Sequence, residues 1–138
     1  MSSRDGLEPT LRFTIMGETR SKGRPRFDPR TRRTYTDKRT NQYEGYVAQC
    51  AGVAMAESVQ SFPIDDPVAI DLVFTLRRPK KPRFELPAIR PDLDNYVKAV
   101  VDGMQMAGVF TDDARIVEIH ARKQYGEEIG ATVAVFEV

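Results

Sequence analysis

Two segments of the chain alternate between apolar and polar residues, a period of two that is typical of strands with one buried face. In the first, 11–16, the odd positions are apolar. In the second, 68–76, the even positions carry large apolar side chains throughout. We therefore expect a strand at each of these two places.

Two further segments repeat apolar residues every three or four positions, the spacing of a helix with one buried face. We expect the first helix to begin at Thr36 or Asp37, either of which suits an N-cap, and to end near Val59. The second is expected at 92–106, and Gly108 is suited to end it.

The remaining apolar segments complete the predicted fold. Strands are expected at 115–125 and 131–138, paired antiparallel through the turn 126–130. The element order is then β-α-β-α-β-β, which predicts the α+β class: a small mixed sheet with two helices packed on it. We expect 1–138 to form a single domain, with 1–9 as a flexible tail.

The composition indicates a globular protein of a reducing compartment. Hydrophobic residues make up 41% of the chain and charged residues 30%. Cys50 is the sole cysteine, which excludes an internal disulfide and a cysteine-based zinc site. Since there is no apolar run of about 20 residues and no secretory signal pattern, we expect no membrane contact and a cytoplasmic, intracellular protein.

The net charge of +1 conceals a strong segregation of charge. Nine basic residues lie within 20–39 and six within 77–90, two segments rich in proline or glycine that are expected to be loops, whereas 92–138 holds nine acidic residues against four basic ones. Basic clusters of this kind favour DNA binding through phosphates. The expected DNA contacts are Lys22, Arg24, Arg26, Arg30, Arg32, Arg33, Arg78, Lys80, Lys81 and Arg83.

Aromatic residues lie among the first group of basic residues. Phe27 and Tyr35 could stack on exposed bases. The alternative for both basic segments is a solvated loop with no partner, which is the usual role of a run of charges.

Acidic residues mark both ends of the second predicted helix. Asp92 and Asp94 lie at its start, with Lys98 one turn beyond Asp94, and Asp112 and Asp113 follow its end. Mg²⁺ prefers a few carboxylates together with water and phosphate oxygens. If the later turn folds back beside the helix start, three or four carboxylates converge on a metal ion.

The same residues have a purely structural alternative. Aspartate is common at helix N-termini, an Asp94–Lys98 pair would stabilise the helix without further function, and 112–113 would then be an ordinary turn. His120, the sole histidine, lies within a predicted strand and is expected on the strand face, not as a catalytic base.

Three segments resemble the RusA family of Holliday junction resolvases. They are Arg90-Pro-Asp-Leu-Asp-Asn-Tyr-Val-Lys-Ala-Val-Val-Asp-Gly-Met104, Val109-Phe-Thr-Asp-Asp-Ala-Arg-Ile-Val-Glu118 and the early Lys22-Gly-Arg-Pro-Arg-Phe27. The resemblance extends from Leu11 to the C-terminus, and the Asp-Leu-Asp-Asn…Lys…Asp-Asp combination is its most specific part.

The resemblance implies a metal site and its residues. Asp92, Asp94 and Asp113 would bind the catalytic ion, and Lys98 would be essential for catalysis. Asp112 would take the place of Asp113 if the match to the family motif were shifted by one residue. The ion would be Mg²⁺, with Mn²⁺ as a substitute, and would activate the attacking water.

The resemblance also implies a substrate and an assembly. Members of the family are homodimers, often encoded by prophages, and cut four-way DNA at symmetric positions in recombination and repair. A two-fold dimer suits two symmetric cuts. Two alternatives stay open: a nuclease selective for flaps or forks, and a basic protein that binds DNA without cleaving it.

Overall fold

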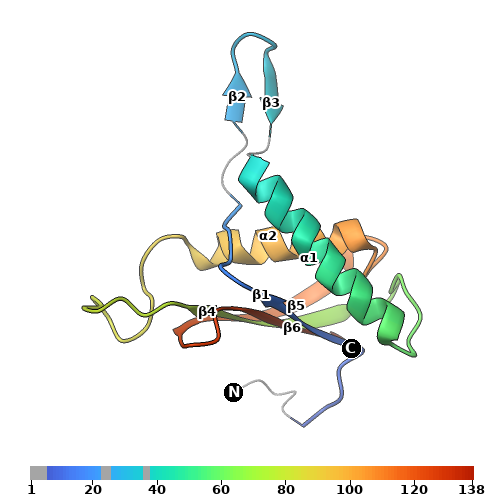
Figure 1. The fold of residues 1–138 in the computed structure, drawn as a ribbon. Helices are drawn as coiled ribbons and strands as arrows, with labels where there is room; N and C mark the ends of the chain where they lie inside the picture. Colours follow the sequence, from blue (N-terminus) through green and yellow to red (C-terminus); the bar gives the residue numbers. More distant parts are fainter. Residues whose placement is uncertain (1–5, 23–25, 36–37) are drawn as a thin grey trace.

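The computed structural model describes residues 6–22, 26–35 and 38–138. It contains a four-stranded mixed sheet with two helices on one face (Figure 1). This confirms the predicted α+β class. The elements of this body are β1 (Leu11–Met16), α1 (Lys38–Glu57), β4 (Val68–Leu76), α2 (Leu93–Ala107), the short 3-10 helix η1 (Asp113–Arg115), β5 (Ile116–Tyr125) and β6 (Gly130–Glu137).

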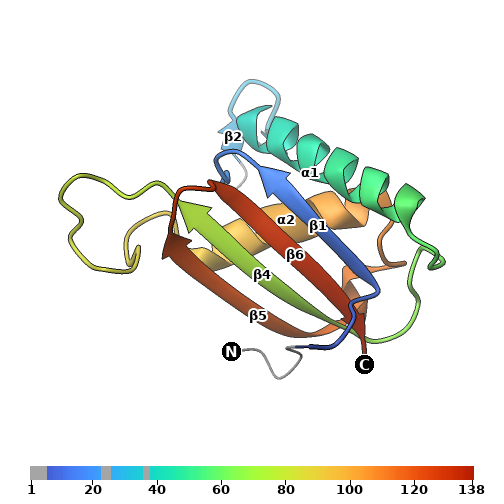
Figure 2. The ribbon, with the colours of Figure 1, turned by 60° about the horizontal axis from the view of Figure 1, so that its bottom comes forward.

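The order of strands across the sheet is β1-β6-β4-β5. β6 runs antiparallel to both of its neighbours, whereas β4 and β5 are parallel and are joined through α2. The prediction that 115–125 and 131–138 pair with each other is therefore wrong, because β6 crosses to the other side of β4. The short connection suggested a hairpin, but the more apolar β6 takes an interior position and the charged β5 takes the edge (Figure 2).

The core lies between the helices and one face of the sheet. Alternate side chains of β4 are buried there, and Phe74 stacks on Tyr96 of α2 with ring centroids 5.3 Å apart. The helices pack closely at Gly103, where an added Cβ would lie 2.6 Å from the Cβ of Val47. α2 ends at Gly108, whose φ of 82° is left-handed, so the predicted stop is confirmed.

A hairpin projects from this body, and the sequence did not predict it. β2 (Arg26–Asp28) pairs antiparallel with β3 (Arg33–Tyr35) inside the segment that was expected to be a loop. The ribbon stands away from the sheet above the start of α1 (Figure 1). The predicted N-caps Thr36 and Asp37 lie outside the described residues.

The chain before β1 passes below the sheet, on the face opposite the helices (Figure 1). Within it, residues 6–9 form no helix or strand, while 1–5 lie outside the described residues. The flexibility predicted for 1–9 stays a prediction. In the part of the chain that is described, no helix combines the length and apolar character that a membrane span requires.

Candidate metal and DNA-binding site

Two aspartates open α2 with their side chains exposed. Asp92 is the N-cap residue, with φ −68° and ψ 146°, and its carboxylate makes no capping hydrogen bond. Asp94 lies in the first turn, near the positive end of the helix dipole. The side chain of Asp92 therefore does not cap the helix, and its carboxylate oxygens are suited to bind a cation.

A hollow of about 480 Å³ lies beside Asp92, lined in part by Arg83 and Lys123. Lys123 Nζ donates to the carbonyl oxygens of Ile89 at 2.8 Å and of Pro91 at 3.0 Å. These bonds fix the backbone that enters α2 against the end of β5. The position of Asp92 is thus determined by the sheet as well as by its own helix.

Lys98 belongs to a network of charges on the exposed side of α2. Its Nζ lies 3.3 Å from Asp102 Oδ1, one turn further along the helix, in place of the Asp94 partner considered from the sequence. The other oxygen of Asp102 accepts from Lys22 Nζ at 2.7 Å, and Lys22 also donates to Glu44 of α1 at 2.8 Å.

Lys22 therefore joins the segment after β1 to both α1 and α2. Its backbone N–H donates to Asn95 O in the first turn of α2, so the strand-to-hairpin segment is held at the start of that helix. Burial lowers the pKa of Lys22, but its hydrogen bonds to Asp102 and Glu44 outweigh that effect and raise the pKa above the ordinary value. Two carboxylates hold its ammonium group, which gives Lys22 a structural role, and its DNA contact stays a prediction.

The turn that carries Asp112 and Asp113 follows the other end of α2. The helix has 15 residues and is therefore about 22 Å long, so the turn cannot fold back beside Asp92 within one chain. The predicted convergence is wrong for the single chain. Among the residues that the structure describes, no three acidic, histidine or cysteine side chains are grouped so as to hold a metal ion.

The two aspartates of this turn differ in their environment. Asp112 Oδ1 accepts from Ala114 N at 2.7 Å and so caps η1, whereas Asp113 is an exposed residue within η1. Asp65 holds the turn from the side, accepting from Thr111 Oγ1 at 2.6 Å and from Arg115 Nε at 3.0 Å. These bonds lower the pKa of Asp65. Asp113 is thus the better candidate ligand of the pair.

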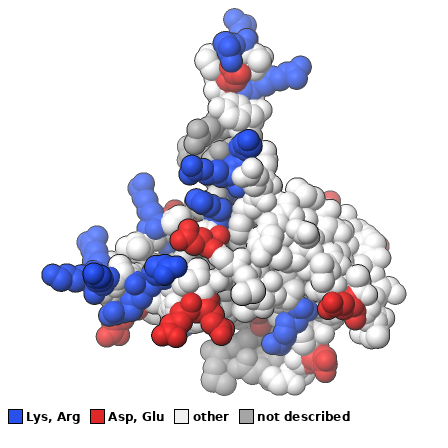
Figure 3. Space-filling view, viewed as in Figure 1, with Lys and Arg blue, Asp and Glu red and all other residues white. Residues whose placement is uncertain are grey.

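The basic residues form two projections with acidic side chains between them (Figure 3). One is the β2–β3 hairpin and the other is the loop 77–91 after β4. The exposed members among the predicted DNA contacts are Arg30, Arg32, Arg33, Arg78, Lys80, Lys81 and Arg83. Phe27 and Tyr35 are also exposed on the hairpin, so base stacking stays open for both. Arg24 and the side chain of Arg26 lie outside the described residues.

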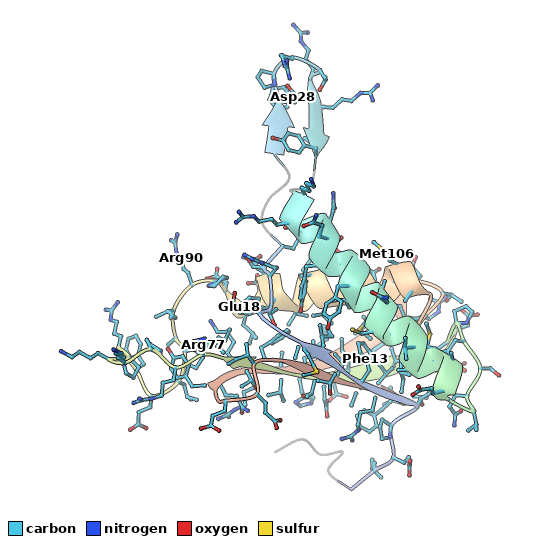
Figure 4. The ribbon with its side chains drawn as sticks, viewed as in Figure 1. Phe13, Glu18, Asp28, Arg77, Arg90 and Met106 are labelled. Carbon is cyan, nitrogen blue, oxygen red and sulfur yellow. The ribbon has the colours of Figure 1, made fainter. Side chains whose placement is uncertain are left out.

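Three acidic residues near α2 were missed from the sequence. Glu18 lies by the start of the helix (Figure 4). Burial of Tyr96 raises the pKa of its hydroxyl, and the negative charge of Glu18 raises that pKa further. Glu44 and Asp102 hold Lys22. The sequence did carry a signal for Glu44 and Asp102. Glu44 interrupts an apolar helix face, and Asp102 lies four residues after Lys98, the spacing of an ion pair on a helix.

His120 lies on β5 with its Nε2 3.0 Å from Glu118 Oε1. Cys50 lies on α1 and is half-buried against the core. Neither residue adds a group to the surface around Asp92.

Comparison with known proteins finds a matching family and a relative. The family model described as "Endodeoxyribonuclease RusA" matches residues 17–136. A curated relative, described as "Uncharacterized protein YqaN" from Bacillus subtilis (strain 168), is 30% identical over 142 residues, which covers 93% of this chain and 96% of the relative.

Proposed function

Because this chain belongs to the RusA family of endodeoxyribonucleases, we propose that it resolves Holliday junctions by Mg²⁺-dependent, symmetric cleavage of phosphodiester bonds. The observation that carries the proposal is the pair Asp92 and Asp94, exposed at the N-terminus of α2 between two basic projections. Carboxylates able to hold a cation next to arginines able to hold phosphates are what hydrolysis of a polyanion requires.

The donor set fits a magnesium ion but is incomplete in one chain. Asp92 and Asp94 supply hard oxygen ligands, and Mg²⁺ accepts one or two carboxylates when water and phosphate oxygens complete its shell. When bound, the ion would lower the pKa of the attacking water and polarise the phosphate. Mn²⁺ could replace Mg²⁺, bound by the same oxygen ligands.

Lys98 would act on the phosphate through its charge. Asp102 orients its ammonium group toward the exposed side of α2, one turn from Asp94. A fixed ammonium there stabilises negative charge that grows on the phosphoryl oxygens. Lys22 and Glu44 act through Asp102, as positioning residues.

We propose further that Asp113 comes from the partner subunit of a homodimer. Within one chain the length of α2 separates Asp113 from Asp94, yet a two-fold axis that relates antiparallel copies of α2 brings each helix start to the other's end. Such a dimer has two identical sites, which suits two symmetric cuts in a four-way junction.

The substrate proposal is tested with labelled synthetic DNA. Purified protein is incubated with four-way, three-way and flap substrates, with and without Mg²⁺. We expect paired, symmetric nicks in the four-way junction and only when Mg²⁺ is present. Preferred cutting of flaps would favour the alternative, a structure-selective nuclease. DNA binding with no cleavage in the presence of Mg²⁺ would favour a basic protein that only binds DNA.

The sharing of the site is tested by mixing subunits. Asp94→Asn and Asp113→Asn are each expected to be inactive alone. After unfolding and refolding together, mixed dimers carry one site with both substitutions and one with neither, so nicking of one strand should return. Persistent inactivity of the mixture would mean that both residues serve a site within one chain.

A further inference from the structure

β5 is an unusually long strand for the edge of a sheet. It spans 10 residues, and in the described part of the chain its sheet neighbour is β4 alone. An edge strand leaves a row of backbone N–H and C=O groups without partners on its outer side, which is a template for pairing with another strand. Among the edge strands that the structure describes, β5 offers the longest template of this kind.

Apolar side chains are exposed along the same edge. Val117 is 63% exposed and Ile119 is 46% exposed, although Ile119 aligns with the buried Ile70 on the helix-covered face. α2 therefore does not reach far enough to cover the outer strand. The side chains of a strand added at this edge would lie beside them.

The charges of β5 are arranged symmetrically and with opposite sign about His120. Glu118 lies two residues before it and Arg122 two residues after it, on the same face of the strand. If two copies of β5 pair antiparallel about His120, each Glu118 lies directly opposite an Arg122. The acidic turn at 112–113 then approaches the basic end of the other strand.

The opposite edge of the sheet does not offer the same surface. β1 has six residues, and α1 packs beside it, so that Tyr46 and Cys50 of the helix line a hollow together with Phe13 of the strand. A helix placed along an edge is one of the ways in which proteins prevent strand addition.

We infer that the β5 edge is the surface through which two copies of this chain associate, by antiparallel pairing of β5 about His120 into a continuous eight-stranded sheet. The two-fold axis is perpendicular to the sheet, so both helix layers lie on one face and the two α2 helices flank the seam in opposite directions.

This inference rests on the homodimer of the proposed function and gives it a geometry. Antiparallel pairing sets the start of one β5 beside the end of the other. The start of β5 follows Asp113, and its end is tied through Lys123 to the backbone that leads into Asp92. The seam therefore carries Asp113 of the partner subunit toward the aspartates of α2.

A charge exchange across the seam tests the pairing. Glu118→Arg and Arg122→Glu each create two repulsive pairs per dimer, so each should raise the dimer dissociation constant by about tenfold. The double variant restores opposite charges with their positions exchanged and should return the constant to within about threefold of the wild type. The measurement is sedimentation equilibrium, with circular dichroism to verify that each variant is folded.

Glu137→Arg, an exposed residue at the end of β6, is the matched control and should leave the dissociation constant unchanged. Equal constants for the wild type and both single variants would overturn the inference, as would a double variant no tighter than the singles. The result is independent of nuclease activity: a protein that dimerises through β5 but cuts no DNA would refute the proposed function and retain the seam.

Discussion

Lys22 shows how a side chain's partners decide its role. Its ammonium group lies between Glu44 and Asp102, and the Glu44 side chain is only 7% exposed. A carboxylate so deeply buried is stable when paired and costly when its partner is removed. Lys22 therefore stabilises the fold and also fixes the point from which the hairpin departs.

We expect Lys22→Met to lower the free energy of unfolding by about 3 kcal/mol, the lower end for breaking a buried ion pair. Urea denaturation followed by circular dichroism measures this. Arg30→Met, on the exposed hairpin, is the control and should change stability by less than about 0.5 kcal/mol. Equal, small effects of both substitutions would contradict the anchoring role.

For single residues, the sequence indicated which side chains gather at the start of α2 better than it indicated which side chains they contact. Asp92, Asp94 and Lys98 were identified from their spacing, and they do share the start of α2. Lys22 was assigned to DNA because its neighbours in the chain are basic. Its actual partners are 22 and 80 residues away, a distance along the chain over which a local pattern carries no information.

The crossing of α1 and α2 depends on the absence of a side chain at one position. Gly103 packs against Val47 and the carbonyl oxygen of Glu44 so closely that a methyl group has no room. Gly52, by contrast, lies in α1 with open space around the same point. The two glycines thus have opposite sensitivity to the same substitution.

Gly103→Ala should destabilise the protein by about 1–3 kcal/mol through overpacking. Gly52→Ala should stabilise it by about 0.5–1 kcal/mol, since alanine is the better helix former. The midpoints of thermal unfolding of the two variants measure the difference. A stabilised Gly103→Ala variant would show that the helices do not meet there.

Periodicity predicted the elements that pack on the core and missed those that do not. β1, β4, α1 and α2 each bury one face and so carry a clear pattern. The β2–β3 hairpin has three residues in each strand, and its described side chains pack on no core, so no alternation marks it. The sheet order was also missed, because pairing depends on which strands are most apolar across the whole molecule.

The hairpin is suited to act as an arm that holds DNA. It stands away from the body with Arg30, Arg32 and Arg33 exposed. A two-stranded ribbon without a core is marginally stable by itself. Contact with a polyanion would both neutralise and support it.

Replacing Arg30, Arg32 and Arg33 with glutamine should weaken junction binding and flatten its salt dependence. The slope of log K against log salt should fall in magnitude by up to about 2.7 if all three contact phosphates. Fluorescence anisotropy of a labelled junction in Mg²⁺-free buffer measures it. Arg12→Gln, on an exposed position of β1, should leave the slope unchanged; the same change in both proteins would argue against a specific arm.

At the scale of the whole molecule, the sequence supplied candidate site residues but could not supply the distance between the two motifs that carry them. The expectation that two motifs 20 residues apart fold together is natural for a short chain, yet α2 is a straight helix between them. The proposed dimer would reconcile this separation with a metal ion shared by both motifs. In that proposal the number of subunits is part of the site.

The most direct test of the account is the cleavage rate of Asp94→Asn on a mobile four-way junction in Mg²⁺, beside its binding to the same DNA. We predict a loss of cleavage of at least about 100-fold, the scale of losing one catalytic charge interaction, with junction affinity within about twofold of the wild type. Glu57→Gln, which alters an exposed carboxylate at the last residue of α1, should cut normally. Full activity of Asp94→Asn would contradict the account.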